Sequence, residues 1–123
     1  MSDSATHMQN ARTECQQAVL DILTEHIRRQ SCITYAALAE RAEIPSPHRI
    51  HKLTEFLEQL IDTDSAQNRP LRAALVISKT GTQLPARGFF LHCEARGLFS
   101  SQHPPSAQAF HTACLDALFA SEG

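Results

Sequence analysis

The sequence lacks several features that mark specialised classes of protein. No apolar run approaches the length of a membrane span, and the first residues lack the basic and then apolar pattern of a secretion signal. The four cysteines form no Cys-x-x-Cys pair and no dense framework, which argues against a disulfide scaffold or a local zinc site. There is no internal repeat and no low-complexity segment. We therefore expect a cytoplasmic protein with reduced cysteines and no membrane contact.

The composition that remains is that of an ordinary globular domain. Hydrophobic residues make up 42% of the chain and charged residues 20%. A chain of 123 residues is long enough to bury a hydrophobic core without disulfides or a structural metal. We expect a flexible N-terminal tail over residues 1–9 and one domain over residues 10–123. The formal net charge of −2 argues against strong non-specific binding to nucleic acid. Residues 41–87 nevertheless contain more basic than acidic side chains.

Two helices joined by a short turn are predicted between residues 33 and 61. Thr34 is a suitable N-cap for the first helix, because its hydroxyl can accept a hydrogen bond from a free backbone N–H of the first turn. Pro45 and Pro47 end that helix, and Ser46 is the predicted N-cap of the second, with Pro47 at its first position. This arrangement is the skeleton of a helix-turn-helix.

The second helix has an apolar stripe and a polar start. The residues predicted to be buried recur at helical spacing: Ile50, Leu53, Phe56, Leu57, Leu60 and Ile61. His48, Lys52 and Glu55 are predicted to be exposed. The first turns also contain Arg49 and His51, and no acid precedes Glu55. A recognition helix presents its N-terminal end to DNA, so these residues are candidates for DNA contacts.

The rest of the chain is interpreted from the same kinds of signal. Apolar spacing predicts a helix from about residue 10 to residue 29, and polar composition predicts a mobile connector over residues 62–70. An apolar run predicts a buried strand over residues 71–78. The turn formers of residues 79–88 then suggest a wing. The predicted fold class is therefore α+β, a winged helix-turn-helix that is mostly helical with a small β-hairpin wing.

Two further helices are expected at the C-terminal end. Residues 89–96 form a short helix that Gly97 stops, and Ser106 caps a last helix. The residues of that helix predicted to face inward are Phe110, Ala113, Cys114, Ala117 and Leu118.

Three segments together resemble a known family. Residues 33–39 (Ile-Thr-Tyr-Ala-Ala-Leu-Ala), 44–49 (Ile-Pro-Ser-Pro-His-Arg) and 75–81 (Leu-Val-Ile-Ser-Lys-Thr-Gly) look like parts of the C-terminal DNA-binding domain of O6-alkylguanine-DNA alkyltransferases and alkyltransferase-like proteins. The resemblance covers roughly residues 30–98. It implies that Tyr35 lies against the DNA backbone near a flipped nucleotide. It also implies that Arg49 enters the minor groove and fills the space of the extruded base.

The chain departs from this family at the active site. The family's Pro-Cys-His-Arg positions fall on Arg72, Ala73, Ala74 and Leu75. Only a thiolate can accept the alkyl group, so alanine in that place implies a protein that is not an enzyme. We therefore predict a non-catalytic DNA-binding protein that needs no cofactor and no metal, with duplex DNA as its partner.

The predicted nucleic-acid-binding residues are Tyr35, Ser46, His48, Arg49, His51, Lys52, Arg72, Lys79 and Arg87. An alternative is a protein-binding adaptor or inhibitor that keeps the scaffold, binds no DNA and uses its acidic flanks and residues 62–70. A zinc site would require His92, Cys93, His111 and Cys114 to converge, and their wide spacing argues against it. The oligomeric state is left open by the sequence.

Overall fold

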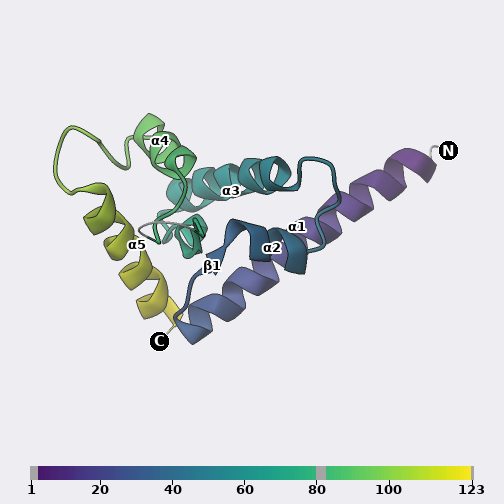
Figure 1. Cartoon of the computed structure of the whole chain (residues 1–123), viewed down its shortest axis with the longest axis horizontal. Helices are drawn as coiled ribbons and strands as arrows, with labels where there is room; N and C mark the ends of the chain where they lie inside the picture. The colour runs from purple at the N-terminus through teal and green to yellow at the C-terminus, as the bar shows by residue number, and fades with distance from the viewer. Residues whose placement is uncertain (1–2, 80–82, 123) are drawn as a thin grey trace.

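The computed structural model describes residues 3–79 and 83–122, with side chains for residues 14–79 and 83–121. Within these residues the elements are α1 (Asp3–Arg29), β1 (Ile33–Thr34), α2 (Tyr35–Arg41), α3 (Arg49–Ala66), the 3-10 helix η1 (Arg72–Leu75), β2 (Val76–Ile77), α4 (Arg87–Ala95) and α5 (Ala107–Glu122). The chain is mostly helical with a small sheet, which confirms the predicted α+β class at this coarse level (Figure 1).

The long helix α1 forms one side of the molecule. Its C-terminal half packs on the core through Val19, Leu23 and Ile27, which confirms the predicted helix over residues 10–29. The helix begins at Asp3, however, ahead of the predicted start, and its first turns extend past the ends of α2 and α3 (Figure 1). No helix within the described residues combines the length and apolar composition needed to cross a membrane.

The short helix η1 lies at the centre of the core, where α1, α3 and α5 all pack against it. Helical spacing of apolar residues in α1 and α3 turns one face of each helix toward η1. The largest apolar side chains that are almost fully buried come from most of the elements: Val19, Leu23, Leu38, Leu53, Ile61, Leu75, Val76 and Leu118.

The start of α2 agrees with the prediction. The Oγ1 of Thr34 accepts a hydrogen bond from the Ala37 N–H at 3.2 Å, and so satisfies one free donor of the first turn. Immediately before it, β1 pairs in parallel with β2, with Ile33 opposite Val76. A parallel pair joins segments that are far apart in the sequence, so this sheet is not a β-hairpin.

The predicted wing over residues 79–88 is described only in part, because residues 80–82 lie outside the described residues. The Ser78 N–H donates to the Leu84 carbonyl at 2.8 Å and closes the loop around them. Arg87 already belongs to α4. Among residues 3–79 and 83–122 there is no antiparallel strand pair, so the predicted β-hairpin is wrong there.

The start of α3 corrects the prediction for Ser46 and Pro47. The helix begins at Arg49, and its N-cap is His48, whose φ is 62° and whose side chain makes no capping hydrogen bond. A left-handed residue cannot belong to an α-helix, so the helix starts after it. The prediction that Ser46 caps this helix is therefore wrong.

The apolar stripe of α3 is confirmed except at its first position. Leu53, Leu57, Leu60 and Ile61 are buried and Phe56 is half-buried, whereas the polar residues predicted to face solvent are exposed: His48, Lys52 and Glu55. Ile50 is 45% exposed, so its predicted burial is wrong. It lies in the first turn of α3, and the other elements cover the stripe only from Leu53 onward.

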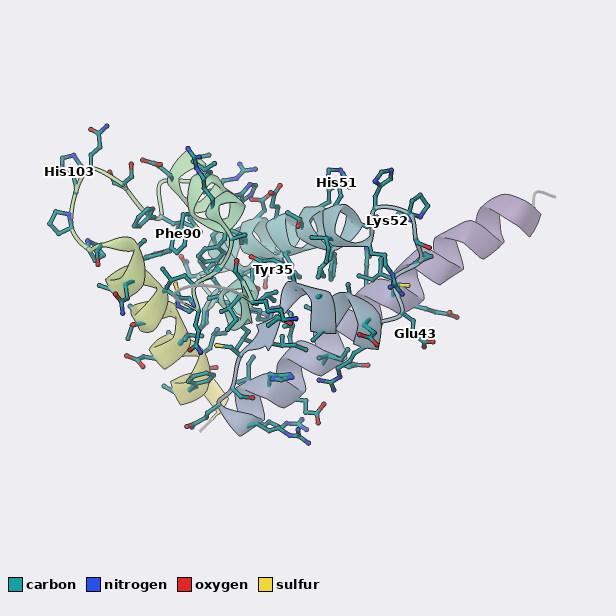
Figure 2. All side chains as sticks on the ribbon, viewed as in Figure 1. Tyr35, Glu43, His51, Lys52, Phe90 and His103 are labelled. Carbon is teal, nitrogen blue, oxygen red and sulfur yellow. The ribbon has the colours of Figure 1, made fainter. Side chains whose placement is uncertain are left out.

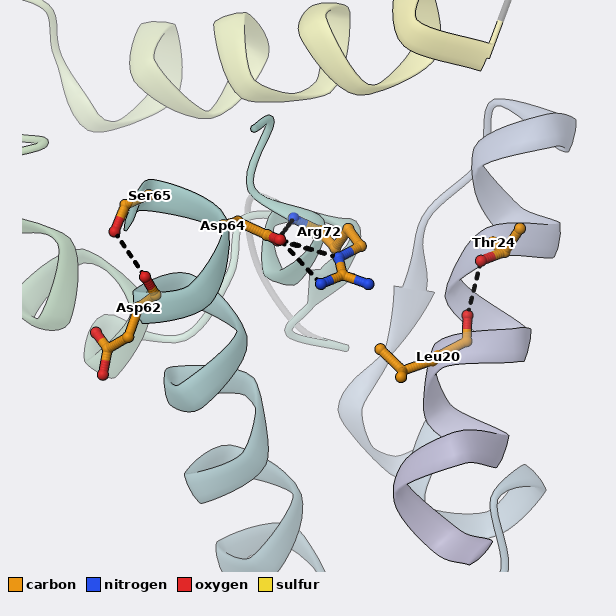
Figure 3. A network of polar contacts seen from close by, with 6 residues as sticks. All are labelled: Leu20, Thr24, Asp62, Asp64, Ser65 and Arg72. Atoms are coloured by element: carbon orange, nitrogen blue, oxygen red, sulfur yellow. Dashed lines mark hydrogen bonds and ion pairs between the residues drawn. The ribbon is translucent and has the colours of Figure 1, made fainter. Parts of the chain in front are cut away.

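The end of α3 also differs from the prediction, because the helix continues to Ala66 through the first half of the predicted connector, residues 62–70. Figure 3 shows the contacts made by Asp64 and Arg72 at this end of the helix. The fully buried carboxylate of Asp64 accepts hydrogen bonds from the Arg72 backbone N–H at 3.1 Å and from its guanidinium at 2.9 Å. A buried carboxylate requires such partners. Together they hold the last turn of α3 against η1.

The predicted strand over residues 71–78 is wrong for most of its length. Its apolar residues are buried as expected, but Arg72–Leu75 form η1 and only Val76–Ile77 form a strand. A short apolar run does not distinguish a buried strand from a buried helical turn, which explains the error.

The predicted ends of the last two helices are confirmed. Gly97, with φ 74°, follows α4, and the Leu98 N–H donates to the Cys93 carbonyl at 2.9 Å. This pattern terminates helices in a left-handed residue and favours glycine there. At the start of α5, the Oγ of Ser106 accepts a hydrogen bond from the Ala109 N–H at 3.2 Å.

The inward face of α5 is confirmed only in part. Leu118 is buried, Phe110 and Cys114 are half-buried, but Ala113 and Ala117 are exposed. The reason is the position of α5 at one side of the molecule (Figure 1), so that other elements cover only one side of this helix.

Candidate nucleic-acid interface

Most of the residues predicted to bind nucleic acid lie together at the start of α3. Ser46 and His48 in the turn, and Arg49, His51 and Lys52 in the helix, are all exposed. Figure 2 shows His51 and Lys52 on the free end of α3, beside the turn that leads from α2. The structure therefore brings this part of the predicted site into one surface.

Local charge makes this helix start positive. The first turn of α3 contains no acid, and its free N–H groups carry the positive end of the helix dipole. The next acid, Glu55, pairs with His51 at 2.7 Å, and both side chains are largely exposed. Exposed pairs of this kind are weak. The first turns therefore present positive charge to solvent.

The two cations at this surface are held in place by the turn. Arg49 donates through Nε to the Ile44 carbonyl at 2.8 Å, and Lys52 donates through Nζ to the Pro45 carbonyl at 3.0 Å. The contacts described for Arg49 do not use its two terminal guanidinium nitrogens, which can donate to a second acceptor. A side chain that is already ordered loses less entropy when it binds a ligand.

Tyr35 lies away from this surface and has an internal role. Its hydroxyl oxygen accepts a hydrogen bond from the Ala86 N–H at 3.0 Å, and burial raises the pKa of the phenol. The ring therefore connects the start of α2 to the segment before α4. Within the described residues, the hydrogen bond made by this hydroxyl is to the backbone of the protein itself.

Arg72 is likewise part of the core structure. Its guanidinium pairs with Asp64 at 2.9 Å, so the donors predicted to contact nucleic acid are engaged inside the fold. The neighbouring Ala73 and Ala74 are almost fully buried. In this chain the segment that resembles the active-site region of the alkyltransferases fills the core between α1, α3 and α5.

Lys79 and Arg87 are exposed and lie on either side of the loop whose central residues are outside the described part. The hydrogen bond between Tyr35 and Ala86 places Arg87 near the start of α2. Within the described residues, no hydrogen bond or ion pair connects either cation to the group at the start of α3.

The residues considered as zinc ligands are used elsewhere. His92 Nε2 lies 2.8 Å from Asp62 Oδ1, and His111 Nε2 lies 2.8 Å from the Ala74 carbonyl oxygen. Within the described ranges, no three His, Cys, Asp or Glu side chains are placed to hold a metal ion.

The two remaining candidate ligands are the buried thiol of Cys93 and the half-buried thiol of Cys114. Burial raises the pKa of Cys93 to about 12, with a smaller contribution from Cys114, and raises the pKa of Cys114 to about 11. Both thiols are therefore protonated at neutral pH, where they are poor nucleophiles and poor ligands.

A groove of about 420 Å³ lies beside the positive helix start and was not predicted. Val19 of α1, Ile44 of the turn, and Leu53 and Phe56 of α3 supply its apolar lining. Apolar spacing predicts which face of each helix is buried, but not where two such faces leave a gap. No sequence signal that we recognise would have located this groove.

Comparison with protein families finds no match for this chain, and neither characterised protein sequences nor solved structures give one. The resemblance to the alkyltransferases therefore stays a prediction from short motifs.

Proposed function

We propose that this protein is a non-catalytic DNA-binding protein of helix-turn-helix type, in which the start of α3 enters a groove of duplex DNA. The observation that carries the proposal is the exposed, acid-free first turn of α3, on which Arg49 and Lys52 are held by turn carbonyls. Helix-turn-helix proteins use this end of their second helix for base and phosphate contacts. In this proposal Lys79 and Arg87 contact the DNA backbone from either side of the loop between β2 and α4.

Arg49 and Lys52 have different roles in this proposal, which a binding titration separates. Arg49→Ala should weaken binding to short duplex DNA by about 1–3 kcal/mol, because it removes a contact to a base edge or to the base stack. Lys52→Ala should weaken binding to all sequences alike and reduce the salt dependence by roughly one counterion.

The control is Arg28→Ala, which removes one exposed positive charge from α1, far along the chain from the proposed site. Fluorescence anisotropy at low and near-physiological salt measures all four proteins. Because Arg49 and Lys52 also hold the turn, unfolding of each variant must be measured in parallel. Absence of binding by the wild-type protein to duplex and single-stranded DNA at low salt would end this proposal.

The non-catalytic part of the proposal has its own test. By the predicted resemblance, Ala73 falls on the position of the alkyltransferase nucleophile, and the thiols of Cys93 and Cys114 have raised pKa values. Incubation with DNA that contains O6-methylguanine should therefore transfer no methyl group to the protein. Mass spectrometry that detects stoichiometric S-methylcysteine would contradict this.

The groove beside α3 favours a second candidate, a protein-binding adaptor that binds no DNA. Its apolar lining suits an apolar side chain of a partner, and Phe56 is half-buried at its edge. An apolar fluorescent dye should bind the wild-type protein and bind Phe56→Gln more weakly, with Leu91→Gln as an exposed control on α4. Dye binding together with failure of the DNA titration would favour the adaptor.

A further inference from the structure

The last helix, α5, is attached to the rest of the molecule by few contacts. Among its described side chains, only His111 and Leu118 are buried, and they lie about two turns apart on one face. An open groove of about 360 Å³ lies between α5 and the segment after α3. Residues 96–106, which connect α4 to α5, contain no helix or strand (Figure 1). Helices with so little coverage open locally at a lower free energy than the whole fold.

Within the described residues, His111 makes the one hydrogen bond that joins α5 to another element. Its Nε2 lies 2.8 Å from the Ala74 carbonyl oxygen of η1, and its residue is only 5% exposed. The other hydrogen bonds described for α5 stay inside the helix or reach its cap, Ser106, and no ion pair joins it to the rest. Because a carbonyl oxygen only accepts, Nε2 carries the proton of the neutral ring. The atom that takes up a second proton is therefore Nδ1.

No counter-charge pairs with the His111 ring within the described part of the chain. On η1, the guanidinium of Arg72 pairs with the Asp64 carboxylate of α3 at 2.9 Å. Cys93 on α4 and Cys114 on α5 are neutral thiols, because burial raises the pKa of each. These elements therefore offer nothing that would stabilise a positively charged imidazole.

The last turns of α1, which also packs on α5, supply no counter-charge either. Their half-buried ionisable residues are Glu25 and His26, and both bond to Arg41 of α2. Burial lowers the pKa of His111, and its bond to the Ala74 carbonyl only partly opposes this effect. A second proton on the docked ring would thus be an unpaired buried charge, which disfavours the docked state.

We propose that α5 is a proton-sensitive helix: when His111 takes up a proton at Nδ1, α5 leaves η1 while α1, α2 and α3 stay folded. In the released state water surrounds the charged ring, so this state binds the proton more tightly than the docked state. Acid therefore shifts the population toward release, which uncovers the faces of α1 and η1 on which α5 packs. The inference does not depend on DNA binding.

The pH range follows from the ordinary pKa of histidine, 6.5, which applies to the solvated ring. Above this pH both states are neutral, and the equilibrium constant for opening of α5 does not change. Below it the released state takes up the proton first, and the opening constant rises by at most about tenfold per pH unit. We expect a rise of up to about tenfold between pH 7.5 and pH 5.5.

Amide hydrogen exchange of the full chain, corrected for the chemical exchange rate at each pH, measures the opening constants of α5 and α3. We expect α5 to open more readily than α3 at every pH, and its opening to depend only weakly on urea, because little surface is exposed. His111→Gln retains a donor for the Ala74 carbonyl but does not titrate, so the acid-induced rise should disappear. His103→Gln replaces an exposed histidine before α5 and should keep the rise.

Thermal unfolding verifies the fold of both variants, and NMR of the wild-type protein gives a second measurement that needs no substitution. The His111 ring should titrate below pH 6.5. Equal opening constants for α5 and α3 at pH 5.5 would overturn the proposal, because α5 would then open only with the whole fold. A rise that persists in His111→Gln would also overturn it, as would a His111 ring that titrates at pH 6.5 while α5 stays protected.

Discussion

Basic side chains at the two ends of α3 have opposite surroundings. At the start, Arg49 and Lys52 are exposed and donate to the carbonyl oxygens of the preceding turn. At the end, Arg72 donates to the carboxylate of Asp64, which has no exposed surface. The first arrangement leaves the positive charge free to meet a partner, whereas the second neutralises it inside the fold. Sequence motifs had placed Arg49 and Arg72 in one binding site, and the structure separates their roles.

Substitution at the C-terminal end of α3, where Asp64 is buried, should have the largest effect on the free energy of unfolding. Asp64→Ala leaves Arg72 without its buried counter-charge, and we expect a loss of about 3–5 kcal/mol in the free energy of unfolding. Urea denaturation measures it. Asp21→Ala on the exposed side of α1 is the control, with an expected change below about 0.5 kcal/mol. Equal effects of the two substitutions would show that the buried pair is not what holds this end.

The apolar stripe of α3 provides the next contrast. Leu57→Ala should cost about 2–5 kcal/mol, through lost burial of the side chain and a residual cavity. Ile50→Ala should cost less than about 1 kcal/mol, because Ile50 is 45% exposed. The same denaturation curves measure both. A large effect at Ile50 would mean that a further element, or a second molecule, covers the first turn in solution.

Loss of one hydrogen bond at the exposed N-terminal end of α3 should change the free energy of unfolding only slightly. Arg49→Ala removes the hydrogen bond to the Ile44 carbonyl, and we expect about 1 kcal/mol of destabilisation. Arg28→Ala should be almost neutral and is the comparison for loss of charge alone. If Arg49→Ala were as damaging as Asp64→Ala, the two ends of α3 would be equally structural.

The smallest effect concerns pH. Burial lowers the pKa of His111 below its ordinary value of 6.5, because the ring is enclosed against η1. As pH falls through 6.5 the unfolded chain takes up the proton first, so the stabilising contribution is full above that pH and declines below it. His111→Gln should reduce this decline without abolishing it, because burial also lowers the pKa of His26. An unchanged pH dependence of the urea midpoint in the variant would contradict this assignment.

The sequence predicted helix ends correctly where the stabilising contacts lie within a few residues of one another. Thr34, Gly97 and Ser106 terminate or cap helices through contacts within a few residues, and all three were predicted correctly. The start of α3 was predicted wrongly because the left-handed backbone at His48 moves it past Pro47. The end of α3 was predicted wrongly because Asp64 is a polar residue, which suggested a loop. In the structure Asp64 is buried and accepts hydrogen bonds from Arg72, eight residues later.

The candidate site follows the same division. That Lys52 and Glu55 face solvent follows from their phase on an amphipathic helix, and the sequence alone determined it. His48 is exposed as predicted, but it lies in the turn before α3, so helical phase does not explain its exposure. Which cations remain free could not be determined in that way. The hydrogen-bond acceptor of an arginine side chain depends on which groups the fold places within about 3 Å of it. The acceptor is a backbone carbonyl for Arg49 and a buried carboxylate for Arg72.

The sequence by itself determined the helical class, the phase of the α3 stripe from Leu53 onward and the helix ends at Thr34, Gly97 and Ser106, because each depends on residues one or two turns apart. Only the tertiary structure decided that residues 72–75 form a central 3-10 helix, that β1 and β2 pair in parallel, and that grooves remain beside α3 and α5. These features arise where faces of different elements meet. Spacing along one segment specifies which side is apolar, but not which other segment will cover it.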